Sequence, residues 1–164
     1  MSINSGLFDA IDLAKYLNFL HKKKYNNKSI SPLKLQKVLF FLFGEWGGFV
    51  SKDVSADNDG KELNNYSKLL FSDAIEAWVY GPVIKKVYEE FEQSTKTYKE
   101  LFISDEEQYV GNFIKDLALE LFELSDFRLV EISHQSEEWN KKFVKEEIFH
   151  NNVMNQDDII NEFI

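Results

Sequence analysis

The amino-acid sequence predicts a mainly α fold of the α+β class: a compact helical domain around a buried central helix, with one small β-hairpin. Three observations predict it. Apolar residues recur at helical spacing in several segments, residues 33–43 are apolar on most sides, and only residues 68–79 show strand-like alternation. With 164 residues, 44% of them apolar, we expect residues 1–164 to form a single domain with a dense core.

The first two predicted helices have recognisable ends. Residues 7–24 repeat alanine and leucine at helical spacing and finish in three lysines, whose charge suits a helix C-terminus. The predicted central helix begins with Ser31 as its cap and Pro32 in its first turn. We expect it to end at the glycines that follow Phe43, namely Gly44, Gly47 and Gly48.

A polar loop is expected at residues 51–67, followed by the hairpin. Asp57, Asp59 and Gly60 resemble the start of a calcium loop, but its later carboxylate is missing, so calcium is not expected. The hairpin's turn is predicted at Ser72-Asp73. Gly81-Pro82 is then expected to stop the second strand and to open a helix.

Later helices are predicted from their caps. Ser104 and Glu107 have the spacing of a capping box, and the apolar face that follows is the most regular in the chain. Three further caps are expected at Ser125, Ser136 and Asn155.

Composition limits the function. The chain has no cysteine, which excludes disulfides and thiolate chemistry and fits a reducing cytoplasm. Its net charge is −9 and its single arginine is Arg128, so nucleic acid is not an expected ligand, whereas a basic protein partner suits this charge. No apolar stretch is long enough to span a bilayer, and no secretory segment is apparent at the start of the sequence. We therefore expect a cytoplasmic protein without a membrane partner.

The first candidate cluster lies at the start of the central helix. Lys34 and Lys37 are three residues apart and share a face, with Gln36 between them. One interpretation is a solvated polar stripe. The other is a partner-binding face, in which two lysines of an acidic protein hold a carboxylate.

The second cluster surrounds the predicted end of the hairpin. Trp78 and Tyr80 are two apart on a strand, so they are expected to point the same way. Such a pair can be a wall of the core or a binding hot spot. Gly81 is expected to serve a tight corner and Pro82 a helix start, and all four are candidate partner-binding residues.

The third cluster contains Ser133, His134 and Trp139. Adjacent residues on a helix point in different directions, so Ser133 and His134 do not form a catalytic dyad by spacing. His134 and a nearby glutamate are too few ligands for a metal, and the other histidines, His21 and His150, lie elsewhere in the chain. No catalytic residue, metal or cofactor is predicted, and His134 and Trp139 join the candidate partner-binding residues.

These clusters, in this order, resemble the Panacea antitoxin domain family, the SocA-like or phage-associated protein group. The resemblance rests on Ser31-Pro32-Leu33-Lys34-Leu35-Gln36-Lys37, on Glu76-Ala77-Trp78-Val79-Tyr80-Gly81-Pro82-Val83, and on Leu129-Val130-Glu131-Ile132-Ser133-His134 before Trp139. Ser133 replaces the family's threonine, and Glu138 replaces the proline before the tryptophan. The similarity extends from about Leu7 to Phe163.

The resemblance implies an antitoxin that neutralises a cognate toxin protein by direct contact, within a toxin–antitoxin system whose toxin gene is adjacent. It also implies a mainly helical fold with a small sheet. Two alternatives stay open. One is an adaptor that delivers the toxin to a protease, and the other is a small hydrolase or transferase that uses His134 with Glu76 or a nearby carboxylate.

Overall fold

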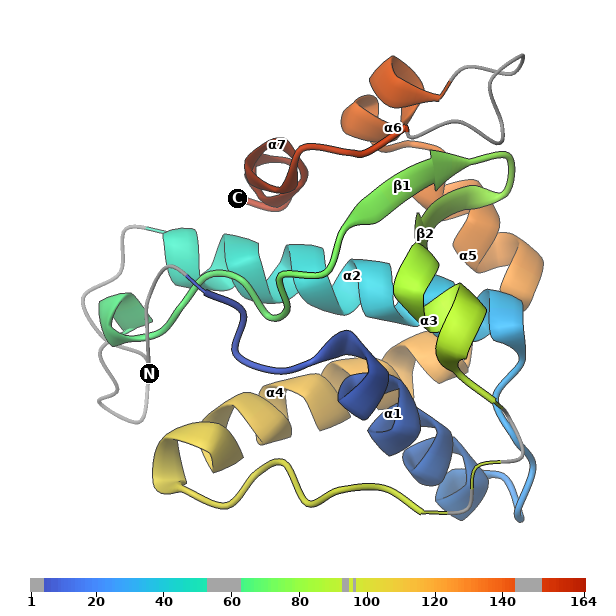
Figure 1. Ribbon diagram of the computed structural model, residues 1–164, viewed down its shortest axis with the longest axis vertical. Helices are drawn as coiled ribbons and strands as arrows, with labels where there is room; N and C mark the ends of the chain where they lie inside the picture. Colours follow the sequence, from blue (N-terminus) through green and yellow to red (C-terminus); the bar gives the residue numbers. More distant parts are fainter. Residues whose placement is uncertain (1–4, 53–62, 93–94, 96, 144–151) are drawn as a thin grey trace.

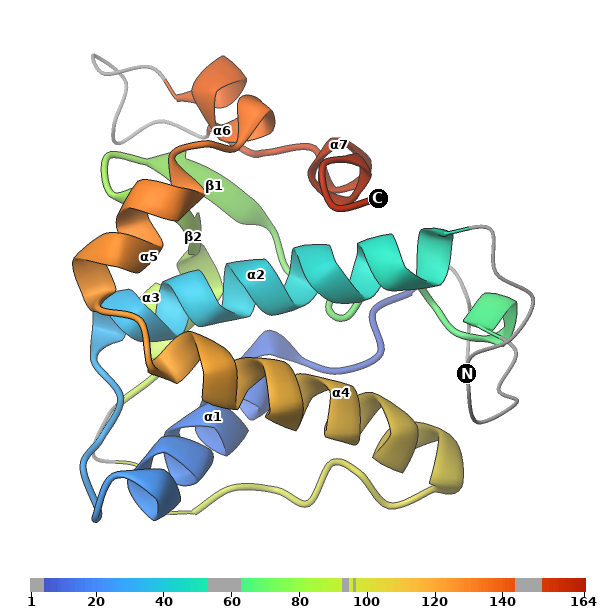
Figure 2. The same cartoon turned by 180° about the vertical axis from the view of Figure 1, so that it is seen from behind.

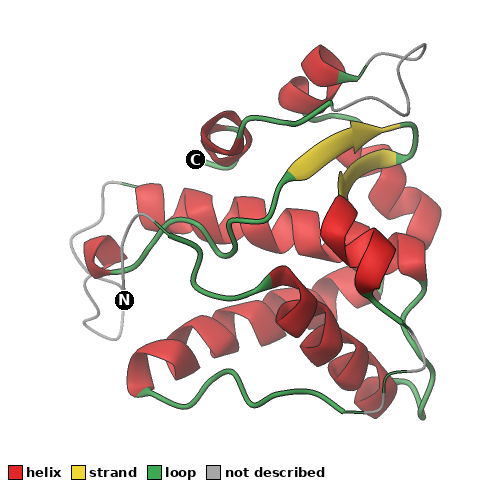
Figure 3. Cartoon of the chain, in the orientation of Figure 1, coloured by secondary structure: helices red, strands yellow, loops and turns green. Residues whose placement is uncertain are grey.

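The computed structural model describes residues 5–52, 63–92, 95, 97–143 and 152–164. They form seven α-helices, one 3-10 turn and one two-stranded antiparallel sheet (Figure 3). The elements, in chain order, are α1 Ala10–Lys24, α2 Pro32–Ser51, η1 Leu63–Asn65, β1 Ile75–Trp78, β2 Gly81–Ile84, α3 Lys85–Glu90, α4 Asp105–Phe122, α5 Asp126–Ser133, α6 Glu137–Lys142 and α7 Gln156–Asn161. The predicted mainly α, α+β class is confirmed.

Helix α2 is the centre of the fold. It lies between α1 and α4 on one side and the hairpin, α6 and α7 on the other (Figures 1 and 2). Its side chains are buried over most of the helix circumference, with Leu39, Phe43 and Trp46 fully inaccessible. A helix that is apolar on most sides gains the most hydrophobic stabilisation when neighbours cover it all round, which explains its position.

The predicted end of α2 was wrong. The helix continues through all three glycines to Ser51. A Cβ atom at Gly44 would overlap the ring of Phe163, and one at Gly47 would lie 2.5 Å from Ile160. The glycines therefore allow the chain around α7 to approach the helix closely, and this packing outweighs their low helix propensity.

The position of the hairpin was also predicted incorrectly. Its turn is Val79-Tyr80, and Gly81-Pro82 starts β2 instead of a helix. Proline is tolerated here because the Pro82 position faces the outer edge of β2, where no strand needs its missing N–H. Asp73, in the predicted turn, instead accepts a hydrogen bond from the Ala10 backbone N–H over 3.0 Å.

The predicted helix caps are confirmed. Ser31, Ser104, Ser125, Ser136 and Asn155 each accept a backbone N–H in the first turn of their helix, and Ser104 with Glu107 completes the capping box. Helix α1 begins three residues later than predicted, because Asp9 caps it.

The residues of the calcium-loop comparison, and His150, lie outside the described residues. In the described ranges no helix combines the length and apolar character that crossing a membrane requires.

Candidate partner-binding site

The structure brings the three sequence clusters together around the hairpin. Strand β2 pairs with β1 along one edge, so alternate backbone groups of β2 point outward. These outward groups are the carbonyl of Pro82 and both the N–H and the carbonyl of Ile84. On the opposite edge of the sheet, residues 152–154 pair with β1, through Ala77 N–H to the Asn152 carbonyl and Met154 N–H to the Ile75 carbonyl.

Two side chains of α2 satisfy the outward groups of β2. The Gln36 amide donates to the Ile84 carbonyl over 3.2 Å and accepts from the Ile84 N–H over 2.8 Å. The Lys37 side-chain nitrogen donates to the Pro82 carbonyl over 2.9 Å. Together they replace the neighbouring strand that an edge strand lacks. The interpretation as a solvated stripe was wrong for Gln36 and Lys37, since both are buried.

Lys37 is a fully buried lysine that has no acidic partner in the part of the chain that the structure describes. Its relative exposure is 0%, and no described carboxylate lies within 4.0 Å of its nitrogen. Burial lowers the pKa of Lys37 from 10.5 to about 7, because a low-dielectric interior disfavours the charged amine. The Lys34 side chain does not join Lys37 at the hairpin. Its nitrogen donates to the Phe122 carbonyl over 2.9 Å and lies 3.7 Å from the Asp126 carboxylate. Lys34 thereby ties α2 to the end of α4 and the start of α5.

Gly81 is the point where the three clusters touch. Its φ angle is +108°, which side chains rarely tolerate. A Cβ atom there would lie 2.5 Å from the Ser133 hydroxyl oxygen and 3.1 Å from Cε of Lys37. The hairpin thus rests directly on α2 and α5.

We expect Gly81→Ala to lower the free energy of unfolding by about 1–3 kcal/mol from backbone strain alone. The overlap with the Ser133 hydroxyl adds to this cost. Thermal or urea unfolding of the purified variant measures it. The double variant Gly81→Ala, Ser133→Ala is the control. It should regain the stability that the single variant loses to the overlap, and it should still lose the stability that backbone strain costs. An unfolding midpoint of Gly81→Ala equal to that of the wild type would contradict the close contact between Gly81 and Ser133.

Ser133 and His134 are not arranged as a catalytic pair. The Ser133 hydroxyl is buried and donates to the Val130 carbonyl over 2.8 Å. The His134 ring stacks on Trp139 with centroids 4.3 Å apart, and its buried Nε2 has no hydrogen-bond partner among the described residues. Trp139 in turn donates from its indole nitrogen to the Trp78 carbonyl over 2.8 Å. His134 and Trp139 thus support the strand that leads into the hairpin turn.

The exposed part of this arrangement is an aromatic surface at the hairpin turn. Val79 and Tyr80 are 51% and 60% exposed, and Tyr88 of α3 is 64% exposed. The Tyr88 ring meets half-buried Trp78 edge to face, with centroids 4.9 Å apart. We call Trp78, Val79, Tyr80 and Tyr88 the turn patch. Trp78 and Tyr80 do not form the predicted same-face strand pair, because Tyr80 lies in the turn.

Tyr88 was missed as a candidate site residue. The signal was available in the sequence, since Val83, Val87 and Phe91 define the apolar face of that segment and Tyr88 falls beside it. A large aromatic residue off the buried face is a candidate for a surface contact.

The described residues contain no group of three or more histidine, aspartate or glutamate side chains placed to hold a metal ion. Fold and site together define the class: an α+β domain whose hairpin is fixed to a central helix and presents an aromatic turn. Residues 58–140, half of the chain, match the family model described as antitoxin SocA-like, Panacea domain. The chain belongs to this Panacea domain family.

The matched range contains the hairpin cluster and the Ser133–Trp139 cluster, whereas the Ser31–Lys37 cluster precedes it. It is narrower than the similarity expected from the sequence clusters. No curated protein and no solved structure matches the chain.

Proposed function

We propose that this protein is a cytoplasmic antitoxin that neutralises a cognate toxin protein by direct contact, without chemistry of its own. Membership of the antitoxin SocA-like family is the observation that carries the proposal. The local geometry supports it, because the serine and histidine that suggested catalysis are used for helix and ring packing. The net charge of −9 favours a toxin with a basic contact surface, since complementary fields speed encounter and favour correct pairing.

We further propose that the turn patch forms part of the toxin-binding surface. Exposed apolar residues that gather in one place mark interaction sites, and tryptophan and tyrosine dominate the residues that carry binding energy. The turn patch is also held in place, because Gln36 and Lys37 hydrogen-bond to the backbone of β2. A surface that is already ordered loses less conformational entropy when it binds. In this proposal Gln36, Lys37, Gly81 and Pro82 position the contact, and Tyr80 and Tyr88 make it.

Co-expression with the product of the adjacent gene tests the function. We expect that product alone to arrest growth, co-expression to restore it, and the two purified proteins to form a stable complex. Growth arrest that persists with no complex formed would contradict the proposal. A fall in the toxin's half-life in the presence of this protein would favour the adaptor alternative over neutralisation by binding.

Removing both tyrosines of the turn patch should weaken toxin binding strongly. Truncation of a hot-spot residue costs about 2 kcal/mol or more, so we expect Tyr80→Ala with Tyr88→Ala to raise Kd at least about 30-fold. Because both side chains are exposed, the unfolding midpoint should change little. Calorimetry with the purified toxin measures Kd.

The matched control for this pair is Ile103→Ala. Ile103, two residues before α4, is 69% exposed. The segment that leads into α4 runs on the opposite side of α2 from the hairpin (Figure 1). Ile103→Ala should leave Kd unchanged. An unchanged Kd in the double tyrosine variant would remove the turn patch from the interface.

A further inference from the structure

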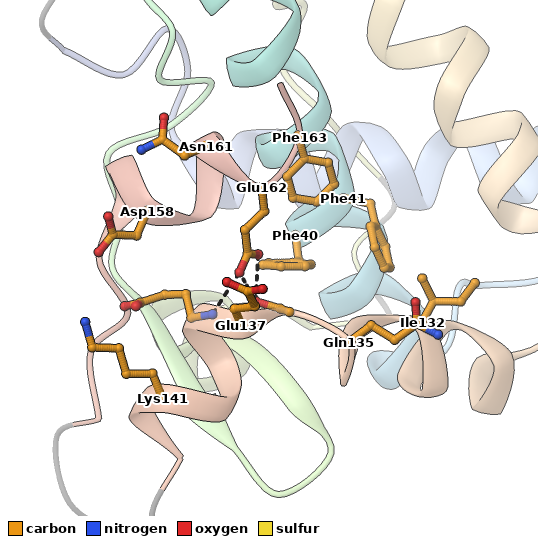
Figure 4. Close-up of a pocket in the computed structure, with 12 residues that line it drawn as sticks. Phe40, Phe41, Ile132, Gln135, Glu137, Lys141, Asp158, Asn161, Glu162 and Phe163 are labelled. Atoms are coloured by element: carbon orange, nitrogen blue, oxygen red, sulfur yellow. Dashed lines mark hydrogen bonds between the residues drawn. The ribbon is translucent and has the colours of Figure 1, made fainter.

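A pocket of about 660 Å³ opens between α2, the segment from α5 to α6, and α7 (Figure 4). It lies apart from the turn patch and shares no residue with it. One wall is aromatic and the other carries carboxylates. The residues that matter are Phe40, Phe41 and Phe163, and Glu137, Asp158 and Glu162.

The aromatic wall is a rigid unit. The rings of Phe40 and Phe41 are 5.3 Å apart, and Phe163 packs against both at 6.0 and 6.4 Å. Phe40 and Phe41 belong to the central helix and are almost entirely buried by the fold. The wall therefore exists before any ligand arrives, and the ring surface that a ligand can reach is chiefly that of half-buried Phe163.

The carboxylates on the opposite wall have no cationic partner within the described ranges. Glu162 accepts from the Ser136 hydroxyl over 2.9 Å and from the Glu138 N–H over 2.8 Å, which fixes its position. Among the described side chains, no lysine or arginine nitrogen lies within 4.0 Å of Glu137, Asp158 or Glu162. Glu138, which also lines the pocket, is instead paired with Lys142 at 3.5 Å.

The pocket thus combines the half-buried ring of Phe163 with exposed carboxylates that have no ion-pair partner among the described residues. Glu162 and Glu137 lie near the ring of Phe40, with Asp158 and Lys141 farther out (Figure 4). Three unpaired carboxylates face this space against one lysine, Lys141. A ligand that fits must be cationic and able to lie against an aromatic face.

We propose that this pocket receives an arginine side chain from a partner polypeptide. A guanidinium group is planar and weakly hydrated, packs on aromatic rings and accepts bidentate pairing with a carboxylate, whereas a lysine ammonium is strongly hydrated and lacks the planar fork. The volume lies within the range in which protein pockets enclose small groups. That this polypeptide is the toxin rests on the proposed function; the arginine preference rests on the pocket alone.

The test uses the whole protein and a peptide probe, without the toxin. Acetyl-Gly-Arg-Gly-amide is titrated into isotope-labelled protein and followed by NMR, with the citrulline peptide as a neutral probe of the same shape. We expect shifts centred on α6, α7 and the Phe40 region, little response to the citrulline peptide, and weakening with added salt. Equal binding of both peptides, or shifts centred elsewhere, would overturn the proposal.

Charge removal from the pocket provides the second measurement. Glu137→Gln with Asp158→Asn should weaken binding of the arginine peptide about fivefold, the effect expected for two partly exposed ion pairs. Asp105→Asn with Glu106→Gln is the matched control, because it removes the same charges from the first turn of α4, away from the pocket. Equal weakening by the two pairs would indicate general charge attraction and refute a specific site. If the peptide binds as expected while the adjacent gene product is not neutralised, the proposed function fails and the arginine site stands.

Discussion

Trp139→Ala is expected to lower the free energy of unfolding by about 3–5 kcal/mol, the cost typical of removing a buried tryptophan. Trp139 is 8% exposed and stacks between His134 and Phe143, with centroids 4.3 and 4.9 Å away. Its indole nitrogen also holds the Trp78 carbonyl at the end of β1. Alanine leaves a cavity in the stack and an unsatisfied carbonyl. Urea unfolding followed by circular dichroism measures the loss.

Trp139→Phe separates the cost of the cavity in the ring stack from the cost of the lost hydrogen bond to the Trp78 carbonyl. Phenylalanine keeps an aromatic ring between His134 and Phe143 but cannot donate to Trp78, so the loss should be smaller than for alanine. Because His134 and Trp139 lie behind the hairpin, we expect toxin binding by Trp139→Ala to weaken in proportion to unfolding and to recover at low temperature. A stable Trp139→Ala protein that fails to bind would instead place Trp139 in the interface.

Features that depend on neighbouring residues could be predicted from the sequence. Each helix cap needs only a side chain and the N–H groups two or three residues later, so Ser31, Ser104 and Ser125 were identified correctly. The central helix was recognisable because its apolar residues surround it. Local signals misled in three places. Gly44, Gly47 and Gly48 do not end the central helix, and Ser72-Asp73 is not the hairpin turn. Gly81-Pro82 suits both a helix start and an edge strand.

Features that depend on distant residues could not be predicted. Nothing near Gln36 and Lys37 in the sequence shows that they are buried, because their backbone partners lie 48 and 45 residues away. The acidic pocket is built by α2, the α5–α6 segment and α7, none of which carries a motif for it. The exposed position of Tyr80 followed only once the true turn was known.

The pH dependence of stability should report the burial of Lys37. The pKa of Lys37 is about 7 in the folded protein and 10.5 in the unfolded chain. Between these values the unfolded chain binds more protons, so this group makes the free energy of unfolding rise with pH, by at most about 1.4 kcal/mol per pH unit. Below about pH 7 the amine is charged in both states, and its contribution no longer changes.

Lys37→Met isolates this contribution, because methionine fills much of the same space and does not titrate. The free energy of unfolding of the wild type minus that of Lys37→Met should rise from about pH 7 towards 10.5. Loss of the hydrogen bond to Pro82 adds a cost of about 1–3 kcal/mol that is independent of pH. Exposed Lys23→Met controls for the change of net charge. Urea unfolding across this pH range measures the difference, and parallel curves for wild type and Lys37→Met would show that Lys37 gains access to water or to an acidic partner in solution.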